Sequence, residues 1–515
     1  MAAGFGKSGS GVKRSLLLKT TAKENLICCV LIAAGTLLNN YWVITSQNGF
    51  LMDDYSWLKI VRFSTVQKIF TFLPAFPYND RPVGAIFIKL LEHFRSMDSL
   101  FHHGSLLCLH LFNTLMVFIV LKKALLRIQK PTGTTIALIA ALIFGMWPNS
   151  TMCVQWLAAV FDLLGVTFCL LSADLFLDAT DEKKKLQRGF NALFCLVFYY
   201  LALRTKEMTI VLPVIFFLFT VLCHLQTSTD KNAFKSFRPP RFLYAHFFLM
   251  IFYFAWVKKL MDAGTGKLTN DPHGSYFYTF DPIVILTSFV KYLAIFFQFE
   301  SASFVFDGFT IIPIIGICFY CLLVGYAVFL LTKGRYTLFI LSLFVPIALG
   351  PVLPMANMQH RLYWYFPSIF MAVLMAVALD RATRKIGRGL WRTACLGCIV
   401  AVGMYLLTFT DGVVVFRNYW ESMCQKDRIS IQDIRKMPPI GDIRQIYVKA
   451  PPGYNVFFYG PGDINAIVFN QADLKTYLYP DRPKDTSSPV YTMHYHPDGH
   501  VDFTGIKSAA DFFSK

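Results

Sequence analysis

The stretch NLICCVLIAAGTLLNNYWVIT, residues 25–45, is an apolar run of about the length, roughly 20 residues, that crosses a bilayer as a helix. The residues before it, 1–24, are basic and polar, and no A-x-A-like cleavage site follows it. It is therefore predicted to be a retained first span and not a signal peptide.

Similar apolar runs recur along most of the chain. The 515 residues are 55% hydrophobic and 16% charged, whereas a soluble domain averages about 25% charged residues. Bare backbone polar groups are not tolerated in lipid, so the runs should be helices. The predicted fold class is an all-α polytopic membrane protein. Nearly all cysteines lie inside the apolar runs, which indicates buried free thiols and not a disulfide framework.

Lysine and arginine gather in six short gaps, at 7–24, 122–130, 182–188, 231–241, 333–335 and 381–392. Basic loops of this kind face the cytoplasm, so they account for the net charge of +18, and no nucleic-acid partner is expected. About eleven spans follow, and an odd number places the amino terminus inside and the carboxyl terminus outside. The spans are predicted at 25–45, 104–121, 134–149, 152–177, 189–203, 208–225, 242–260, 309–331, 336–353, 364–380 and 393–410.

Residues 282–299 are also apolar, but a span there would put Lys333 and Arg335 outside. They are predicted to form a re-entrant or interfacial helix, with a twelfth span as the alternative.

The organisation predicted is a cytoplasmic segment 1–24, a transmembrane domain 25–410 with a structured first outer loop 46–103, and an extracytoplasmic soluble domain 411–515. In the loop, STVQKIFTFLPAF (64–76) and VGAIFIKLLEHF (83–94) are typical of amphipathic helices on the membrane surface. The soluble domain is predicted to be α/β or mostly β. Its β-like runs are 444–450, 454–460, 465–471, 475–480 and 490–496.

Several charged residues converge on the outer face in this topology. Because charge at membrane depth is costly unless paired or solvated, such residues are functional candidates. They are Asp53, Asp54, Asp80 and Arg81 in the first loop, Asp162 about three turns inside the fourth span, Arg204, Lys206 and Glu207 in a tight turn, and His360 and Arg361 in a later loop.

These residue types suit glycosyl transfer from a lipid-phosphate-linked sugar. A carboxylate can act as general base on an acceptor hydroxyl, and arginine and lysine can hold the leaving phosphate. One base opposite the leaving phosphate predicts a single inverting displacement. Asp53 is the first choice for the base and Asp54 the second. The phosphate is assigned to Arg204, Lys206, His360 and Arg361, with Asp80, Arg81, Asp162 and Glu207 in support; no metal or other cofactor is expected.

Each assignment has a structural alternative. Two acids after a span can start an interfacial helix, Lys206 and Glu207 can form an ion pair with each other, and Arg361 can extend to the interface. His102, His103 and His110 could suggest a metal, but the first two diverge on a helix, so a ligand set is not expected.

The order of motifs resembles the GT-C superfamily of polyprenyl-phosphate-sugar-dependent glycosyltransferases. It is most similar to protein O-mannosyltransferases and to the transmembrane O-mannosyltransferases that carry tetratricopeptide repeats. The resemblance covers roughly residues 25–380. Its motifs are FLMDDY (50–55), NDRPVGAIFIKLLEHF (79–94), FHHGSLLCLHLFNTLMVFIV (101–120), ALIFGMWPNSTMCVQWLAAVFDLLGVTF (141–168), LRTKEMTIVLP (203–213) and HRLYWYFPS (360–368).

The resemblance implies a catalytic acid at Asp53 or Asp54 and phosphate-gripping cations at Lys206 and Arg361. It also implies a polyprenyl-phosphate sugar as donor and a glycan, lipid or protein acceptor. Where the repeat-bearing relatives have His-Pro, a Glu and an Arg, this chain has Trp147-Pro148, Met152 and Val160. These differences argue against mannose and a protein acceptor.

The repeats of those relatives are replaced here by residues 411–515, which are expected to bind acceptor or shape the cavity. A bacterial inner membrane, with the active site facing the periplasm, is preferred over the endoplasmic reticulum. A non-catalytic lipid-handling transporter and a catalytically inactive scaffold are the alternatives.

Overall fold

A computed structural model describes most of the chain. The described residues are 22–45, 49–50, 53–71, 81–128, 132–181, 185–227, 237–260, 277–298, 306, 308–383, 389–449, 461–478 and 489–508. Asp80 and the predicted strand 454–460 lie outside them.

Each of the eleven predicted spans coincides with a helix or a helix pair, so the helical membrane class is confirmed. The helices are α2 (Ala22–Asn40), α7 (Ser99–Arg127), α8 (Gly133–Met146) with α9 (Pro148–Gln155), η1 (Leu157–Ala159) with α10 (Val160–Asp181), α11 (Lys185–Leu203), η2 (Glu207–Val211) with α12 (Leu212–Thr227), α14 (Arg241–Leu260), α16 (Ile311–Thr332), α17 (Thr337–Leu349), η4 (Arg361–Trp364) with α18 (Pro367–Ala382), and α19 (Leu390–Leu407).

Among the described residues, 7 helices are long and apolar enough to cross a membrane, and the bent pair α8–α9 makes an eighth candidate. That pair bends by 53° at Trp147–Pro148, because proline lacks the N–H that would continue α8 and suits the first turn of α9. The number of crossings, eleven, stays a prediction.

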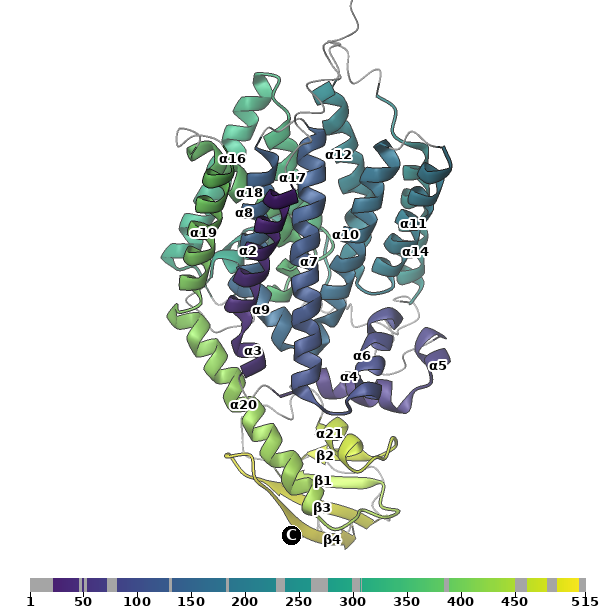
Figure 1. Cartoon of the computed structure of the whole chain (residues 1–515). Helices are drawn as coiled ribbons and strands as arrows, with labels where there is room; N and C mark the ends of the chain where they lie inside the picture. Colours follow the sequence, from purple (N-terminus) through teal and green to yellow (C-terminus); the bar gives the residue numbers. More distant parts are fainter. Residues whose placement is uncertain are drawn as a thin grey trace, which may run out of the picture.

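The two ends of the helical bundle differ in character (Figure 1). The described helix ends that border the predicted basic gaps lie at one end. The other end carries α3 (Trp42–Thr45), the helices of the first outer loop and the C-terminal domain. The loop helices are α4 (Asp53–Phe63), α5 (Val66–Thr71) and α6 (Pro82–Phe94). We refer to this second end as the site end.

Helix α15 (Pro282–Phe297) lies along one short segment between α17 and α18. Just before α15 begins, Tyr278 pairs with Met355. The Tyr292 hydroxyl donates to the carbonyl oxygen of Met358 at 3.2 Å. The same segment thus follows α15 over much of its length, and whether α15 is re-entrant, interfacial or a twelfth span stays a prediction.

The C-terminal domain is α/β, as predicted. Helix α20 (Asp411–Lys436) leads into a sheet of order β2-β1-β3-β4, in which β1 is parallel to β2 and β3, and β3 is antiparallel to β4. The strands are β1 (Gln445–Lys449), β2 (Lys475–Leu478), β3 (Pro489–Tyr495) and β4 (Val501–Ser508). Three of the predicted strands are present, whereas β4 and α20 were not predicted.

The strand predicted at 465–471 is wrong, because residues Pro461–Val468 form helix α21. A short apolar run fits a strand or a buried helix equally well. The sheet decides between them here: β1 and β2 are parallel, and parallel neighbours need a crossover connection, usually a helix.

The packing of α16 on α15 offers a test with a matched control. A Cβ atom at Gly316 would lie 2.1 Å from Cδ2 of the Phe297 ring, whereas one at Gly325, on the same helix, meets nothing within 4 Å. We expect Gly316→Ala to lower the free energy of unfolding by about 1–3 kcal/mol through overpacking. Gly325→Ala should be neutral or stabilise by up to about 1 kcal/mol. Thermal unfolding of the detergent-solubilised variants measures both, and equal shifts would contradict the packing.

Candidate active site

The two adjacent acids open helix α4 but have different surroundings. Asp54 is fully buried, and its Oδ1 accepts a hydrogen bond from the backbone N–H of Ala158 at 2.8 Å. Asp53 is only partly buried. Both lie in the first turn of α4, where carboxylates are favoured. Asp54 therefore joins α4 to η1, and Asp53 is the more accessible carboxylate.

The Phe161 side chain connects α4 and α6 to the start of α10. Its ring lies 4.4 Å from the Trp57 ring of α4. A Cβ atom at Gly84 of α6 would come within 2.3 Å of the same ring. Phe161 thus fixes both loop helices next to Asp162.

Asp162 and Lys206 form a buried ion pair, with Nζ 2.9 Å from Oδ2. Asp162 was predicted about three turns inside a span, but it lies in the first turn of α10, because α9 ends before Trp156. The backbone of Gly165 allows this pair to form: a Cβ atom there would lie 3.0 Å from Cβ of Lys206.

Glu207 pairs with Arg81 of the first loop and not with its neighbour Lys206. Nε of Arg81 donates to Oε2 of Glu207 at 3.0 Å, and Nη2 donates to Oε1 at 2.6 Å. The Arg81 guanidinium also lies over the Phe161 ring, 5.4 Å from its centroid. Lys206 and Glu207 therefore do not pair with each other, in contrast to the alternative prediction. The Arg81–Glu207 pair binds the first loop to η2, and the Asp162–Lys206 pair binds α10 to the turn before η2.

His360 and Arg361 reach the same place from the loop before α18. Arg361 is buried, and its Nη2 donates to the carbonyl oxygen of Gln298 at 3.0 Å. The His360 ring lies 5.7 Å from the Trp156 ring, and its Nδ1 accepts from the N–H of Leu362. Burial, reinforced by the charges of Lys206 and Arg361, lowers the pKa of His360 to about 3. His360 is therefore neutral at pH 7 and offers a hydrogen bond but no charge.

Other predicted residues take secondary positions. The Arg204 side chain is half-buried, and its carbonyl oxygen accepts from the N–H of Val83 at 3.4 Å, which attaches α6 to the 204–206 turn. The histidines with a possible metal role contact backbone instead: the ring nitrogens of His103 lie 3.1 Å and 3.0 Å from the carbonyl oxygens of Val154 and Gly49. Within the described ranges, no group of three or more His, Cys, Asp or Glu side chains is arranged to hold a metal ion.

The structure adds residues that sequence reasoning missed. The Tyr363 ring lies 5.5 Å from Nζ of Lys206 and so links η4 to the Asp162–Lys206 pair. Tyr363 stands inside the motif HRLYWYFPS, but nothing in that motif distinguishes it from the aromatic residues beside it. Asp53, Lys206 and Arg361 thus belong to elements that meet at the site end through Phe161, Asp54 and Tyr363.

No known protein family and no curated protein matches the sequence. Solved structures do match. The crystal structure of ArnT from Cupriavidus metallidurans bound to undecaprenyl phosphate aligns over 91% of this chain and 93% of that chain, with 12% identity and a TM-score of 0.51. The archaeal oligosaccharyltransferase AglB from Archaeoglobus fulgidus, in complex with an inhibitory peptide and a dolichol-phosphate, aligns over 92% of this chain and 65% of that chain, with 12% identity and a TM-score of 0.46.

The match to ArnT shows that this chain has the fold of that protein. The predicted GT-C resemblance is thereby confirmed at the level of fold, and the narrower resemblance to O-mannosyltransferases stays a prediction. The candidate residues lie where the first outer loop meets the bundle.

The Asp162–Lys206 pair gives a test of how the helical bundle is held together at the site end. We expect Lys206→Met to destabilise the protein by about 3–5 kcal/mol, because it leaves a buried carboxylate without its cation. Adding Asp162→Asn should restore much of the loss. The exposed pair Lys436–Asp433 is the control, since Lys436→Met should cost at most about 1 kcal/mol. The measurement is the free energy of unfolding in lipid-detergent micelles; additive losses in the double variant would contradict the pairing.

Proposed function

We propose that this protein is a glycosyltransferase that moves a sugar from a polyprenyl-phosphate donor to a hydroxyl acceptor by a single inverting displacement. The observation that carries the proposal is the joint position of an accessible carboxylate, Asp53, and two buried cations, Lys206 and Arg361, at one end of a GT-C bundle. The fold itself is that of an integral membrane protein, because its described helices include several that are long and apolar enough to cross a membrane.

Asp53 is proposed as the general base. A base must remain accessible to the acceptor hydroxyl whose proton it takes. Asp54 is fully buried and accepts from the N–H of Ala158, so its role is to fix α4. The structure thus supports Asp53, the first choice from the sequence.

Lys206 and Arg361 are proposed to hold the donor phosphate. The donor is a phosphodiester, and the released lipid phosphate carries one more negative charge, so cations placed beside it stabilise the bond-breaking step. The ion pair with Asp162 holds the Lys206 ammonium at this position. His360 can add a neutral hydrogen bond beside these two cations, and Arg204 precedes Lys206 by two residues.

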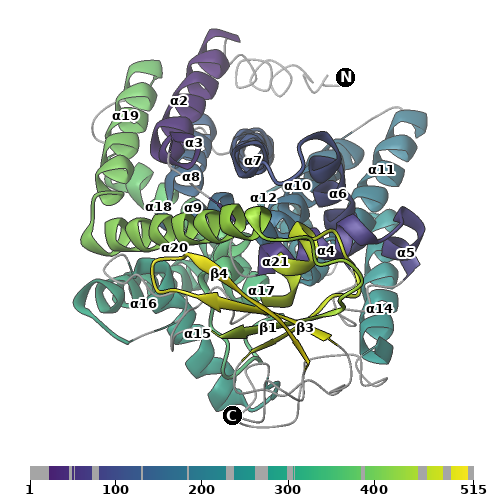
Figure 2. The ribbon, with the colours of Figure 1, turned by 90° about the horizontal axis from the view of Figure 1, so that it is seen from below.

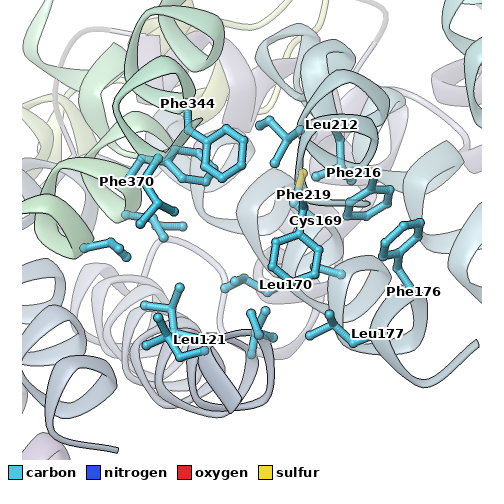
Figure 3. Close-up of a pocket in the computed structure, with 18 of the residues that line it drawn as sticks. Leu121, Cys169, Leu170, Phe176, Leu177, Leu212, Phe216, Phe219, Phe344 and Phe370 are labelled. Atoms are coloured by element: carbon cyan, nitrogen blue, oxygen red, sulfur yellow. The ribbon is translucent and has the colours of Figure 1, made fainter. Parts of the chain in front are cut away.

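A cavity inside the bundle suits the donor's hydrocarbon tail (Figure 3). It has a volume of about 120 Å³ and is lined by apolar side chains, Leu170, Leu212, Phe216 and Phe370 among them. The lining begins with Cys169, Leu212 and Phe366, which follow Asp162, Lys206 and Arg361 by five to seven residues. At about 1.5 Å per residue, the cavity begins roughly 10 Å inward from the proposed phosphate site.

The site end is proposed to face the periplasm of a bacterial inner membrane. The described helix ends that border the predicted cytoplasmic gaps, which are rich in lysine and arginine, lie at the opposite end of the bundle. The acceptor is proposed to be a glycan, lipid or protein hydroxyl presented from that side.

Asp53→Asn tests the base. We expect kcat for transfer to fall by on the order of 10²–10⁴-fold, because no base then takes the proton of the acceptor hydroxyl. The affinity for polyprenyl phosphate should stay within about twofold. Transfer is measured in membranes supplied with lipid-linked sugars. Asp442→Asn, at an exposed turn of the C-terminal domain, is the control. Undiminished transfer by Asp53→Asn would remove the base and leave a lipid-handling or scaffold protein as the better description.

Leu170→Trp tests the cavity. The larger side chain fills space beside Phe216 and Phe344, so we expect KM for a long-chain donor to rise about tenfold, with little change for a donor of one or two isoprene units. The ratio of the two KM values is the readout, since a general loss of stability would raise both. Leu322→Trp, on an exposed face of α16, is the control. An unchanged ratio would show that the tail lies elsewhere.

A further inference from the structure

The C-terminal domain grips α4, the helix that carries the proposed base. Helix α21 binds it through Asp463, which accepts a hydrogen bond from the Ser56 hydroxyl at 2.6 Å and forms an ion pair with Lys59 at 3.0 Å. One turn further on, Nη1 of Arg62 donates to the carbonyl oxygen of Ile467 at 3.1 Å. Figure 2 shows α21 over α4 at the site end.

Helix α20 approaches the same region with a buried stripe formed by Trp420, Cys424 and Asp427. Their spacing of four and three residues places them on one face of the helix. The Trp420 ring lies 6.4 Å from the Trp156 ring. A Cβ atom at Gly49 would lie 3.1 Å from Cβ of Cys424. This face therefore packs on the chain just before the acid pair.

The later turns of α20 contact the sheet of its own domain. The Ser430 hydroxyl donates to the carbonyl oxygen of Gly499 at 2.7 Å, and Oδ2 of Asp433 lies 2.8 Å from Nδ1 of His500. Position along the helix separates the roles of two aspartates, since Asp433 contacts the sheet and Asp427 lies beside α4.

Asp427 lies on the face of α20 that meets the bundle. It is 1% exposed, and within the described part of the chain neither carboxyl oxygen has a well-aligned hydrogen bond. Two groups of α4 act on it: the Tyr55 hydroxyl, as a hydrogen-bond donor, and the Asp54 carboxyl group. Burial disfavours the charged form of such a carboxyl group.

The groups that act on Asp427 are Asp54 and Tyr55 of α4. On its own helix, Cys424 also senses the charge of Asp427. Burial raises the pKa of Asp427 well above its usual range; the Tyr55 hydroxyl opposes this rise and the Asp54 charge adds to it.

We propose that Asp427 is a positioning residue for the transfer reaction: on the buried face of α20 it packs toward Tyr55 and Asp54, and so holds α4 with Asp53 in place. The effect on the transfer reaction rests on the proposed function, whereas the hold of Asp427 on α4 does not. It makes the C-terminal domain a part of the active site's framework.

The sign of the pH effect follows from the raised pKa. The folded state keeps a proton that the unfolded chain releases, so the packing is strongest at low pH and weakens as pH rises through the raised value. Above it, two buried carboxylates repel each other and α4 loosens. The wild-type rate should therefore fall toward alkaline pH, and a side chain that cannot ionise should remove that fall.

The test compares Asp427→Asn and Asp427→Ala with Asp433→Asn as control, all in the full-length protein. Asp427→Asn, which imitates the neutral acid, should keep kcat within about twofold and lose the alkaline fall. Asp427→Ala should lower kcat by up to about 10²-fold, the cost of a misplaced reacting group, with donor KM little changed. Amide hydrogen exchange of residues 53–63 should quicken in Asp427→Ala alone.

Two results would overturn the proposal. If Asp427→Asn loses as much activity as Asp427→Ala, an ionised carboxylate is needed there. If α4 exchanges at the wild-type rate in Asp427→Ala, this residue does not hold the helix. A wild type that transfers no sugar but shows the expected exchange pattern would remove the proposed function and leave the hold on α4 intact.

Discussion

The buried ion pair between Asp162 and Lys206 is the constraint on which the site end depends. Neither charge can stay inside the protein alone, because the desolvation penalty amounts to several kcal/mol for each ion. The pair therefore forces the first turn of α10 against the turn before η2. Gly165 permits that approach, since its missing Cβ leaves room for the Lys206 side chain.

A second pair brings the first outer loop to this junction. Arg81 precedes α6, and its two hydrogen bonds to Glu207 attach α6 beside Lys206. Paired donors on a planar guanidinium fix orientation as well as distance. Because Phe161 also lies under Arg81, the same contacts that neutralise charge give α4 and α6 a common apolar support. Ion pairing and apolar packing thus converge on two adjacent residues, Phe161 and Asp162.

The sequence was most informative where lipid restricts the chain. Hydropathy located the helices because a bilayer admits few alternatives to them. It could not assign partners: Lys206 stands beside Glu207 in the chain yet pairs with Asp162, a choice made by the packing of α10. The 465–471 run was ambiguous because its period is too short to separate strand from helix. Asp54 was the second choice for the base, and the sequence could not show that it is buried and bound to the N–H of Ala158, which favours Asp53 as the base.

The position of the proposed base illustrates why such partners are invisible in one sequence. Helix α4 has 11 residues, and isolated helices shorter than about 12–15 residues are marginal in water. Its place must then come from tertiary contacts, and these come from residues more than 100 positions away, Ala158, Phe161 and Asp463. The bundle supplies one side of that support and the C-terminal domain the other. A proposed base on a helix held from two sides keeps its geometry only while both sides remain docked, so the C-terminal domain can influence the proposed chemistry through the position of α4.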